Sequence, residues 1–154
     1  FGGYFGTWRR ASEVSSLTFT HADFAAHGAA LGCGVVFALP RGACGLAETS
    51  RVLRWLAAEN AGQCGPCMYG LPAISEAFDR VLAGGKRGRE SMTRLTSLFP
   101  LVEGRGACRF PDGVVRFVRT ALDTFADDVA RHLAGSRCTA QQALLPTPAT
   151  GGWR

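Results

Sequence analysis

The stretch GLAETSRVLRWLAAENAGQCGPCMYGLPAISEAFDRVLA, residues 45–83, decides the fold because it holds two helical patterns joined by a short elbow. In the first pattern, apolar residues recur at the spacing of one helix face, and the pattern ends at Asn60 and Gly62. The second pattern covers residues 66–83 and ends at two consecutive glycines. Two helices with so short a connection predict an antiparallel helical hairpin.

Two more helical patterns follow this hairpin. One covers about residues 89–102, and the other begins at the Pro-Asp pair of residues 111–112 and continues to Gly135. Four consecutive helices with short loops predict an antiparallel four-helix bundle over residues 45–135. The composition then turns to Ser, Thr, Gln, Pro and Gly, so residues 136–154 are interpreted as a flexible tail that is ordered only where it docks.

The region before the bundle, residues 1–42, is predicted to contain strands. SLTFT at residues 16–20 alternates polar and apolar side chains, and GCGVVFALP at residues 32–40 is typical of a buried strand. A short helix is expected between them, with Thr20 as its candidate N-cap. The sequence therefore predicts an α+β protein in which a small mixed region precedes the helical bundle.

Composition and charge exclude several classes of protein. Of the 154 residues, 47% are hydrophobic and 19% are charged, which is typical of a globular chain. The basic cluster KRGR, residues 86–89, lies between helical patterns without interleaved aromatic residues, so we interpret it as a solvated loop and expect no nucleic-acid partner. The most apolar stretch, residues 24–40, is interrupted by His27 and three glycines, and we expect no direct membrane insertion.

The six cysteines and the first residue bear on where the protein works and how long it is. No secretion signal is recognisable, so clustered thiols favour a reducing, cytoplasmic location, where they bind metal or do chemistry more often than they pair. The chain starts at Phe1, and FGGYFGTW is typical of the middle of a folded region. We therefore expect it to be a fragment of a longer protein.

The predicted bundle sorts the cysteines between its two ends. In an up-down-up-down arrangement the two loops at one end bring together Cys64, Cys67 and Cys108. Cys44 and Cys138 belong to the opposite end, roughly 22 Å away at 1.5 Å per helical residue. His132, near the end of the last helix, is interpreted as structural, because a histidine there offsets the negative end of the helix.

Three thiols at one end of a bundle are a credible ligand set for zinc or an iron–sulfur cluster. Glycines in the two loops allow tight turns and leave backbone N–H groups free to face a cluster. Two alternatives remain: the cysteines could be merely structural, or Cys64 and Cys67 could form a redox dithiol whose pKa is lowered by Arg105 and Arg109. The loop glycines are Gly62, Gly65, Gly104 and Gly106.

Residues 59–70, ENAGQCGPCMYG, and residues 106–113, GACRFPDG, resemble the iron–sulfur region of the flavoprotein subunit of NADH:quinone oxidoreductase, the NADH-oxidising subunit of respiratory complex I. GGYFGTW at residues 2–8 and GAALGCGVVFAL at residues 28–39 are similar to the second half of that family's β-grasp, ubiquitin-like domain. The resemblance covers about residues 1–134. It implies a partial β-grasp region followed by an iron–sulfur-binding bundle.

Carried over by position, the resemblance implies that Cys64, Cys67 and Cys108 bind iron of a [4Fe–4S] cluster. The position of the family's first cysteine ligand is held by Ala61, whose methyl group cannot bind iron. The site would therefore keep an exchangeable iron, lose it to give a [3Fe–4S] cluster, or be empty. The candidate fourth ligands are Glu59, Asn60 and Gln63 nearby, and Cys33 farther away.

The resemblance implies an electron-transfer module that accepts electrons from a flavin. The family's NADH and FMN site would lie upstream of the residues given, so the fragment alone should not oxidise NADH. Expected partners are other redox subunits or a ferredoxin-like acceptor, through which the protein could be peripheral to a membrane. The alternative is a non-catalytic subunit-docking module with a degenerate metal site, and zinc on the same three thiols is a third hypothesis.

Overall fold

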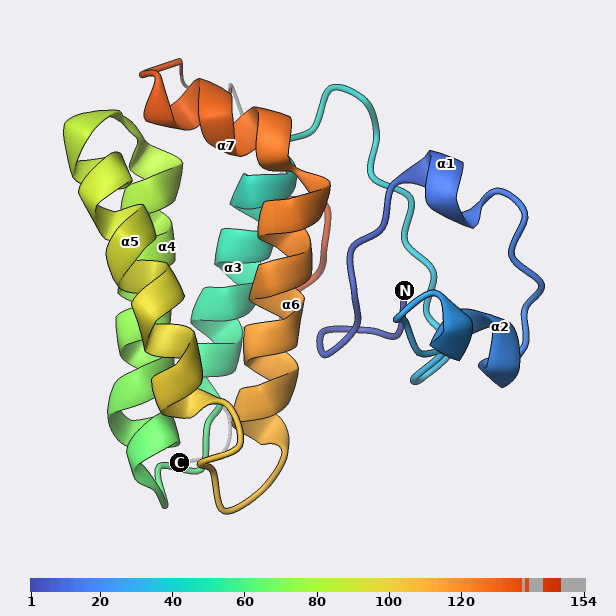
Figure 1. Ribbon diagram of the computed structural model, residues 1–154, viewed down its shortest axis with the longest axis horizontal. Coiled ribbons are helices and arrows are strands. Elements are labelled where there is room, and N and C mark those ends of the chain that lie inside the picture. Colours follow the sequence, from blue (N-terminus) through green and yellow to red (C-terminus); the bar gives the residue numbers. More distant parts are fainter. Residues whose placement is uncertain (137, 139–142, 148–154) are drawn as a thin grey trace.

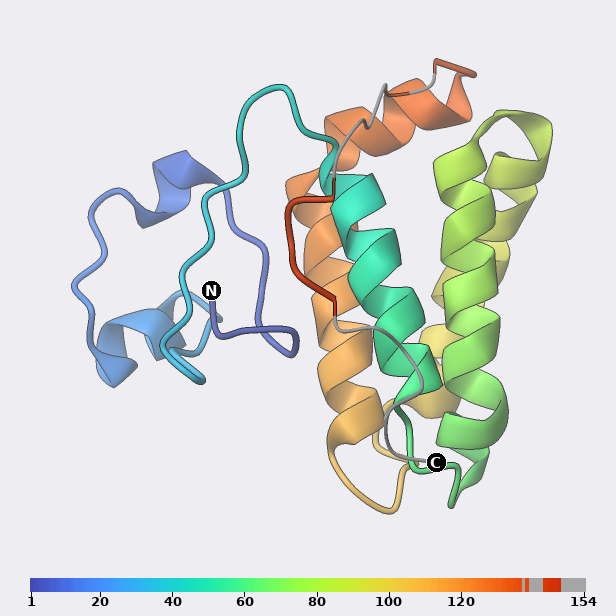
Figure 2. The same ribbon diagram turned by 180° about the vertical axis from the view of Figure 1, so that it is seen from behind.

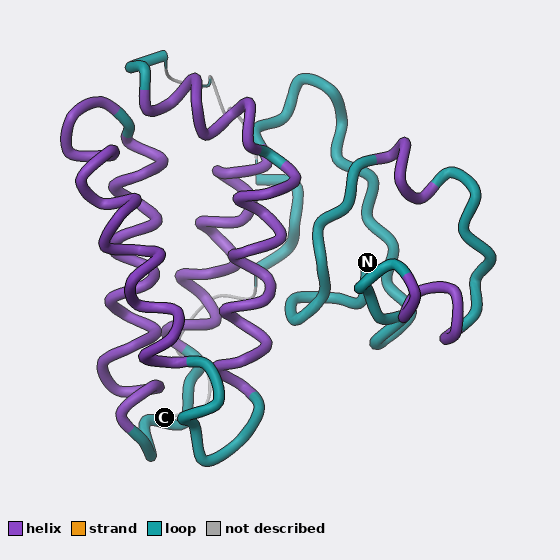
Figure 3. The backbone as a smooth tube through the Cα atoms, viewed as in Figure 1, coloured by secondary structure: helices purple, strands orange, loops and turns teal. Residues whose placement is uncertain are grey.

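The computed structural model describes residues 1–136, 138 and 143–147, and these consist of helices and loops (Figures 1 and 3). No strand is assigned among them. The predicted α+β class, with a partial β-grasp region, is therefore wrong for the described part of the chain. No helix in that part is both long and apolar enough to cross a membrane.

The segment expected to be a buried strand, residues 32–40, has no strand partner in the described residues. Gly2 N–H donates to the Val35 carbonyl (2.9 Å), but no ladder continues from this bond. Val35 and Val36 are 48% and 52% exposed, so the valines that favoured a strand do not fill a core. An extended segment without a neighbouring strand cannot form a sheet, which is why the residue pattern alone was misleading.

Two short helices occur in this region, α1 (Ala11–Val14) and α2 (His21–Ala26). The helix predicted after Thr20 is α2, and the Thr20 hydroxyl accepts a hydrogen bond from Asp23 N–H (3.2 Å), as an N-cap does. The region packs on the bundle through aromatic rings. The ring pairs are Tyr4–Trp55, Phe5–Phe110 and Trp8–Phe125, with centroids 5.0, 4.9 and 5.1 Å apart.

The rest of the described chain forms a helical bundle. Helices α3, α4, α5 and α6 run alternately up and down, side by side, as both views show (Figures 1 and 2). Their inward faces bury leucine, valine and phenylalanine side chains, each of which contributes about 1.5–3 kcal/mol on burial. The elements are α3 (Gly45–Ala58), the π-helix η1 (Pro66–Gly70), α4 (Leu71–Ala83), α5 (Gly85–Val102), α6 (Phe110–Thr124) and α7 (Ala126–Leu133).

The helix predicted to run without interruption to Gly135 is in fact two helices. Helix α6 stops before Phe125, whose φ of −105° and ψ of 32° are not helical, and α7 then crosses the end of the bundle (Figure 1). The Phe125 ring occupies the space where a Cβ on Gly45 would lie, so the break fits the start of α3 closely. Apolar periodicity continues through the break, and the sequence pattern could not reveal it.

Two further segments differ from expectation. The cluster KRGR, residues 86–89, is the first turn of α5 rather than a loop, and Arg89 Nη1 donates to the Leu133 carbonyl at the end of α7 (2.6 Å). The predicted flexible tail, residues 136–154, lies largely outside the described residues. Within it, the Leu145 N–H donates to the buried Glu48 carboxylate (2.9 Å), so residues 143–147 dock on α3.

Candidate functional site

The loops at one end of the bundle carry three cysteines. The connection from α3 to η1, residues 59–65, and the connection from α5 to α6, residues 103–109, lie together at the bottom of Figures 1 and 2. We call this the thiol-rich end, because it holds the thiols of Cys64, Cys67 and Cys108. The bundle topology expected from sequence correctly placed these three residues at one end.

The local backbone explains how Cys67 is presented. Cys67 lies in the π turn η1, where Leu71 N–H donates to the carbonyl of Pro66, five residues earlier. Pro66 suits this first turn because its missing N–H would have no helical partner. The elbow before it is tightened by Gly62, with φ of +63°, whose N–H donates to Asn60 Oδ1 (2.8 Å). π turns within helices occur frequently at functional sites.

The thiols of Cys64 and Cys67 are in different environments. Backbone N–H groups of Ala107 and then Cys67 donate to the Cys64 sulfur and lower the pKa of that thiol. Cys67 is only 3% exposed, and burial first, then its hydrogen bond with Cys64 and the nearby charge of Cys108, raises its pKa. Ala107 and Cys108, which affect these two thiols, both belong to the loop of residues 103–109, which lies beside the loop of residues 59–65 (Figure 1).

The two arginines proposed to activate a dithiol have other partners. Arg109 Nη1 donates to Asp112 Oδ2 (2.9 Å), and Arg105 Nε donates to the Pro100 carbonyl (3.1 Å). The lowered pKa of Cys64 comes from backbone N–H groups rather than from either arginine. The electrostatic argument for a redox dithiol therefore loses its basis.

Asp112 fixes the shape of the second loop. Its Oδ1 accepts a hydrogen bond from Gly104 N–H (2.7 Å), and this bond, followed by the bond from Arg109, lowers the pKa of the carboxyl group. Asp112 also lies in the first turn of α6, where a negative charge offsets the positive end of the helix. The carboxylate thus holds the loop that carries Cys108.

Replacing Asp112 with asparagine should reduce stability at pH 7. A folded-state pKa below the unfolded value means that the carboxylate stabilises the fold above about pH 4 and that this contribution is lost as the pH falls through the folded-state pKa. The difference between wild type and D112N in urea denaturation should therefore shrink as the pH falls below about 4. D123N, an exposed carboxylate on the same helix, is the matched control; an equal pH-dependent loss there would contradict the assignment.

Residue 61, where the resemblance implies the family's first cysteine ligand, is an alanine and offers no side-chain donor. Ala61 is exposed, and its carbonyl accepts a hydrogen bond from Gln63 Nε2 (3.1 Å). Asn60 uses its side-chain oxygen for Gly62 and its nitrogen for the Ala57 carbonyl (2.5 Å). Cys33 lies in the N-terminal region, with its Sγ 3.6 Å from the Gly2 carbonyl. The structure therefore does not bring Cys33 to the thiol-rich end.

The three thiols of the thiol-rich end do not form a compact ligand set for one ion. Among the described residues, the three sulfurs are not all within 4.8 Å of one another, whereas two thiolates on one zinc ion are about 3.8 Å apart. In an iron–sulfur cluster each cysteine binds a different iron, so the three sulfurs need not lie around a single point.

The fold and these loops define a helical module with a thiol-rich end. The chain belongs to the family described as the NADH-ubiquinone oxidoreductase-F iron-sulfur binding region, whose sequence model matches residues 43–132, more than half of the chain. This confirms the resemblance seen in the cysteine segments. It also makes an iron–sulfur cofactor the established expectation for this region.

Two relatives show the same relationship over a longer stretch. The chain is 24% identical over 130 residues to NADP-reducing hydrogenase subunit HndC of Solidesulfovibrio fructosivorans, covering 84% of this chain and 26% of that protein. It is 28% identical over 114 residues to an NADH-quinone oxidoreductase subunit of Rhizobium meliloti (strain 1021), covering 73% of this chain and 27% of that protein. The chain thus spans about a quarter of the length of these curated relatives.

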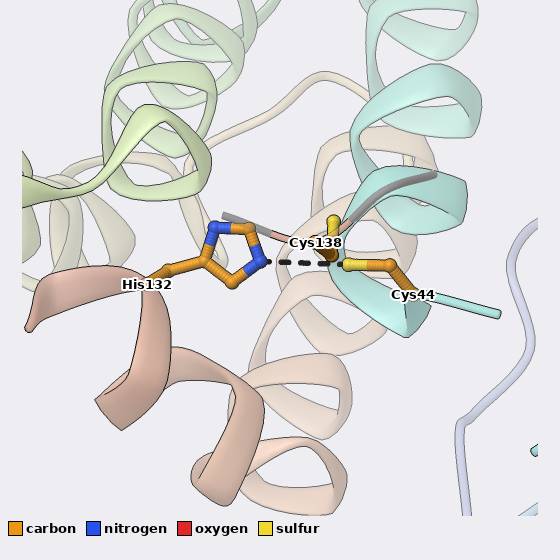
Figure 4. Close-up of side chains that lie close together, drawn as sticks. All are labelled: Cys44, His132 and Cys138. Carbon is orange, nitrogen blue, oxygen red and sulfur yellow. Dashed lines mark hydrogen bonds between the residues drawn. The ribbon is translucent and has the colours of Figure 1, made fainter. Parts of the chain in front are cut away.

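The opposite end of the bundle holds a group that the sequence interpretation missed. Cys44, His132 and Cys138 place their ligand atoms within 4.8 Å of one another (Figure 4). Burial, followed by a hydrogen bond with Cys138, raises the pKa of Cys44 to about 12. Bundle topology had placed Cys44 and Cys138 at this end, but His132 was interpreted as structural. The short spacing in sequence between His132 and Cys138 was the available signal.

Proposed function

We propose that this chain is the iron–sulfur-binding part of an NADH dehydrogenase-type subunit and transfers electrons through a cluster held by Cys64, Cys67 and Cys108. The observation that carries the proposal is that the two loops bearing these three cysteines lie together at one end of a module of this family (Figure 1). A bound cluster would supply one-electron redox chemistry. The protein's own task is to hold the cluster and set its surroundings.

Each thiol has a distinct role in this proposal. Cys67 is buried and anchors the cluster on the bundle core, while Cys64 is held by N–H groups that favour its thiolate. Cys108 is exposed and lies just before α6, so it would face a partner. The positive ends of α6 and of the continuous helix formed by η1 and α4 both point to this site and favour its negative charge.

Three cysteine ligands would leave one iron of a [4Fe–4S] cluster exposed at Ala61. That iron would bind water or another oxygen ligand, or leave to give a [3Fe–4S] cluster. The NADH and FMN sites of the whole protein would belong to the part of the relatives that this chain does not cover. Other redox subunits or a ferredoxin-like protein would accept the electrons, with a cytoplasmic location peripheral to a membrane.

A second candidate, subunit docking, is favoured by apolar side chains near the same end. Met68 and Tyr69 follow Cys67 directly, and both are exposed, as is Leu101 at the end of α5. An exposed apolar group of this kind is typical of a protein contact. If no cluster forms, these residues would make the module a docking unit with a degenerate metal site.

Iron and sulfide content decides between these functions. After anaerobic purification and reconstitution of the full native chain, we expect about three to four iron atoms per chain with matching sulfide and a reducible EPR signal. C67S should lose most of this iron, because the buried anchor is gone. C33S, in the N-terminal region, is the control and should keep it. Near-zero iron and sulfide in wild type would overturn the electron-transfer proposal and leave docking.

A further inference from the structure

Where α7 crosses the bundle, three side chains that can bind a metal converge from separate segments. Cys44 lies directly before α3, His132 is in the last turn of α7, and Cys138 follows in the chain (Figure 4). Cys44 and His132 are 88 residues apart in sequence. Among the described residues, this is the one group of three such side chains whose ligand atoms all lie within 4.8 Å of one another.

The distances suit a single tetrahedral ion. Cys44 Sγ lies 3.7 Å from His132 Nε2. Zinc–sulfur and zinc–nitrogen bonds of the usual lengths, meeting at a tetrahedral angle, put the two ligand atoms about 3.6 Å apart. The ligand atoms are therefore nearly in position before any ion is bound.

The orientation of His132 is fixed in the way that metal-binding histidines usually are. Its Nδ1 is 2.5 Å from the Leu82 carbonyl, which can only accept a hydrogen bond, so Nδ1 carries the proton. Nε2 is then unprotonated, and its lone pair faces Cys44. In metal sites, the imidazole nitrogen that does not bind the metal usually donates such a hydrogen bond. This bond fixes the tautomer and the ring orientation of the ligating histidine. His132 is 3% exposed and Cys44 is 6% exposed, so both are held by packing.

The charges also balance. Each thiol would release its proton to solvent on binding, and two thiolates with a neutral imidazole would cancel the charge of Zn²⁺. The nearby Arg131 is paired with Asp128, so its guanidinium does not oppose the ion alone. Cys138 is only partly buried, which leaves room for water as a fourth ligand.

We propose that Cys44, His132 and Cys138 form a zinc site that fastens α7 and the chain after it to the start of α3. This site is separate from the thiol-rich end, because α3 runs between the two ends of the bundle (Figure 1). It binds a single ion through two thiolates and one imidazole, with an open fourth position. Its role is structural, as a clasp across the end of the bundle.

Cobalt binding tests the site without interference from the cluster. In the full native chain carrying C64S, C67S and C108S, Co²⁺ should bind in one equivalent with thiolate charge-transfer absorption, and Zn²⁺ should displace it. Adding C138S should weaken binding by about tenfold or more, since one ligand is lost. Cys138 is partly exposed, so this change does not open the core. C33S is the matched control and should leave binding unchanged.

Zinc content of the protein with its cluster cysteines intact provides the second measurement. Wild type should retain about one zinc per chain, C138S and H132N should lose it, and iron content should stay the same in all three. The proposal would be overturned if neither the C64S/C67S/C108S variant bound Co²⁺ nor the protein with these cysteines intact bound Zn²⁺. A Cys44–Cys138 disulfide in freshly isolated protein would also overturn it. Because iron and zinc are measured separately, failure here is distinct from failure of the electron-transfer proposal.

Discussion

Replacing Gly84 with alanine should lower the free energy of unfolding by about 3 kcal/mol or more. Gly84 has φ of +77° and ψ of −164°, a region essentially restricted to glycine. A Cβ there would lie 2.1 Å from the His132 carbonyl oxygen and 2.9 Å from its carbon. Because these are backbone atoms of α7, no rotamer change can relieve the clash. Urea denaturation followed by circular dichroism measures the loss.

The neighbouring glycine provides the control for this prediction. Gly85 also has a positive φ, +66°, but a Cβ there would meet no atom within 4 Å. G85A should therefore cost only the strain of a left-handed residue, about 1–2 kcal/mol. Equal losses in G84A and G85A would show that α7 does not pack against this turn as described.

Replacing Ala61 with cysteine should slow the loss of iron from the reconstituted protein by about tenfold or more. The added thiol would stand where the family has its first cluster ligand and would hold the iron that three cysteines leave exposed. Exposure of Ala61 means that the new side chain displaces no core atoms. Absorbance during a chelator challenge gives the rate, and EPR reports the change in cluster type.

A11C adds an exposed thiol in the N-terminal region and serves as the control. It should lose iron at the wild-type rate, because α1 lies away from the thiol-rich end (Figure 1). If A61C behaves like A11C, the thiol at residue 61 does not reach the cluster, and the loop geometry departs from that of the family.

The parts of the fold that sequence could predict depend on local signals. Asn60, Gly62 and the glycines after residue 83 mark the ends of α3 and α4, and bundle topology then places each cysteine at an end. The break at Phe125 is invisible locally, since it depends on the fit of one ring against Gly45. The strand expected at residues 32–40 failed because a strand requires a partner that its own residues do not specify.

The candidate sites also contain residues that local sequence signals reveal and residues that only the fold brings together. Cys64 and Cys67 are recognisable from their spacing, and Cys108 joins them once the helices are paired. The group of Cys44, His132 and Cys138 depends on α7 turning across the bundle, and no pattern along the chain predicted that turn. The tautomer of His132 depends on the Leu82 carbonyl, 50 residues away in sequence.

The π turn at Pro66–Gly70 holds one residue more than an α-helical turn would use. Residues after this turn fix which face of α4 meets the core, whereas Cys67 lies within the turn and Cys64 lies just before it. Deleting one of residues 68–70 would leave a continuous helix but rotate Cys67 by about 100° relative to that core face. A single deletion at this turn would therefore preserve the helical fold while moving Cys67 away from the proposed cluster site.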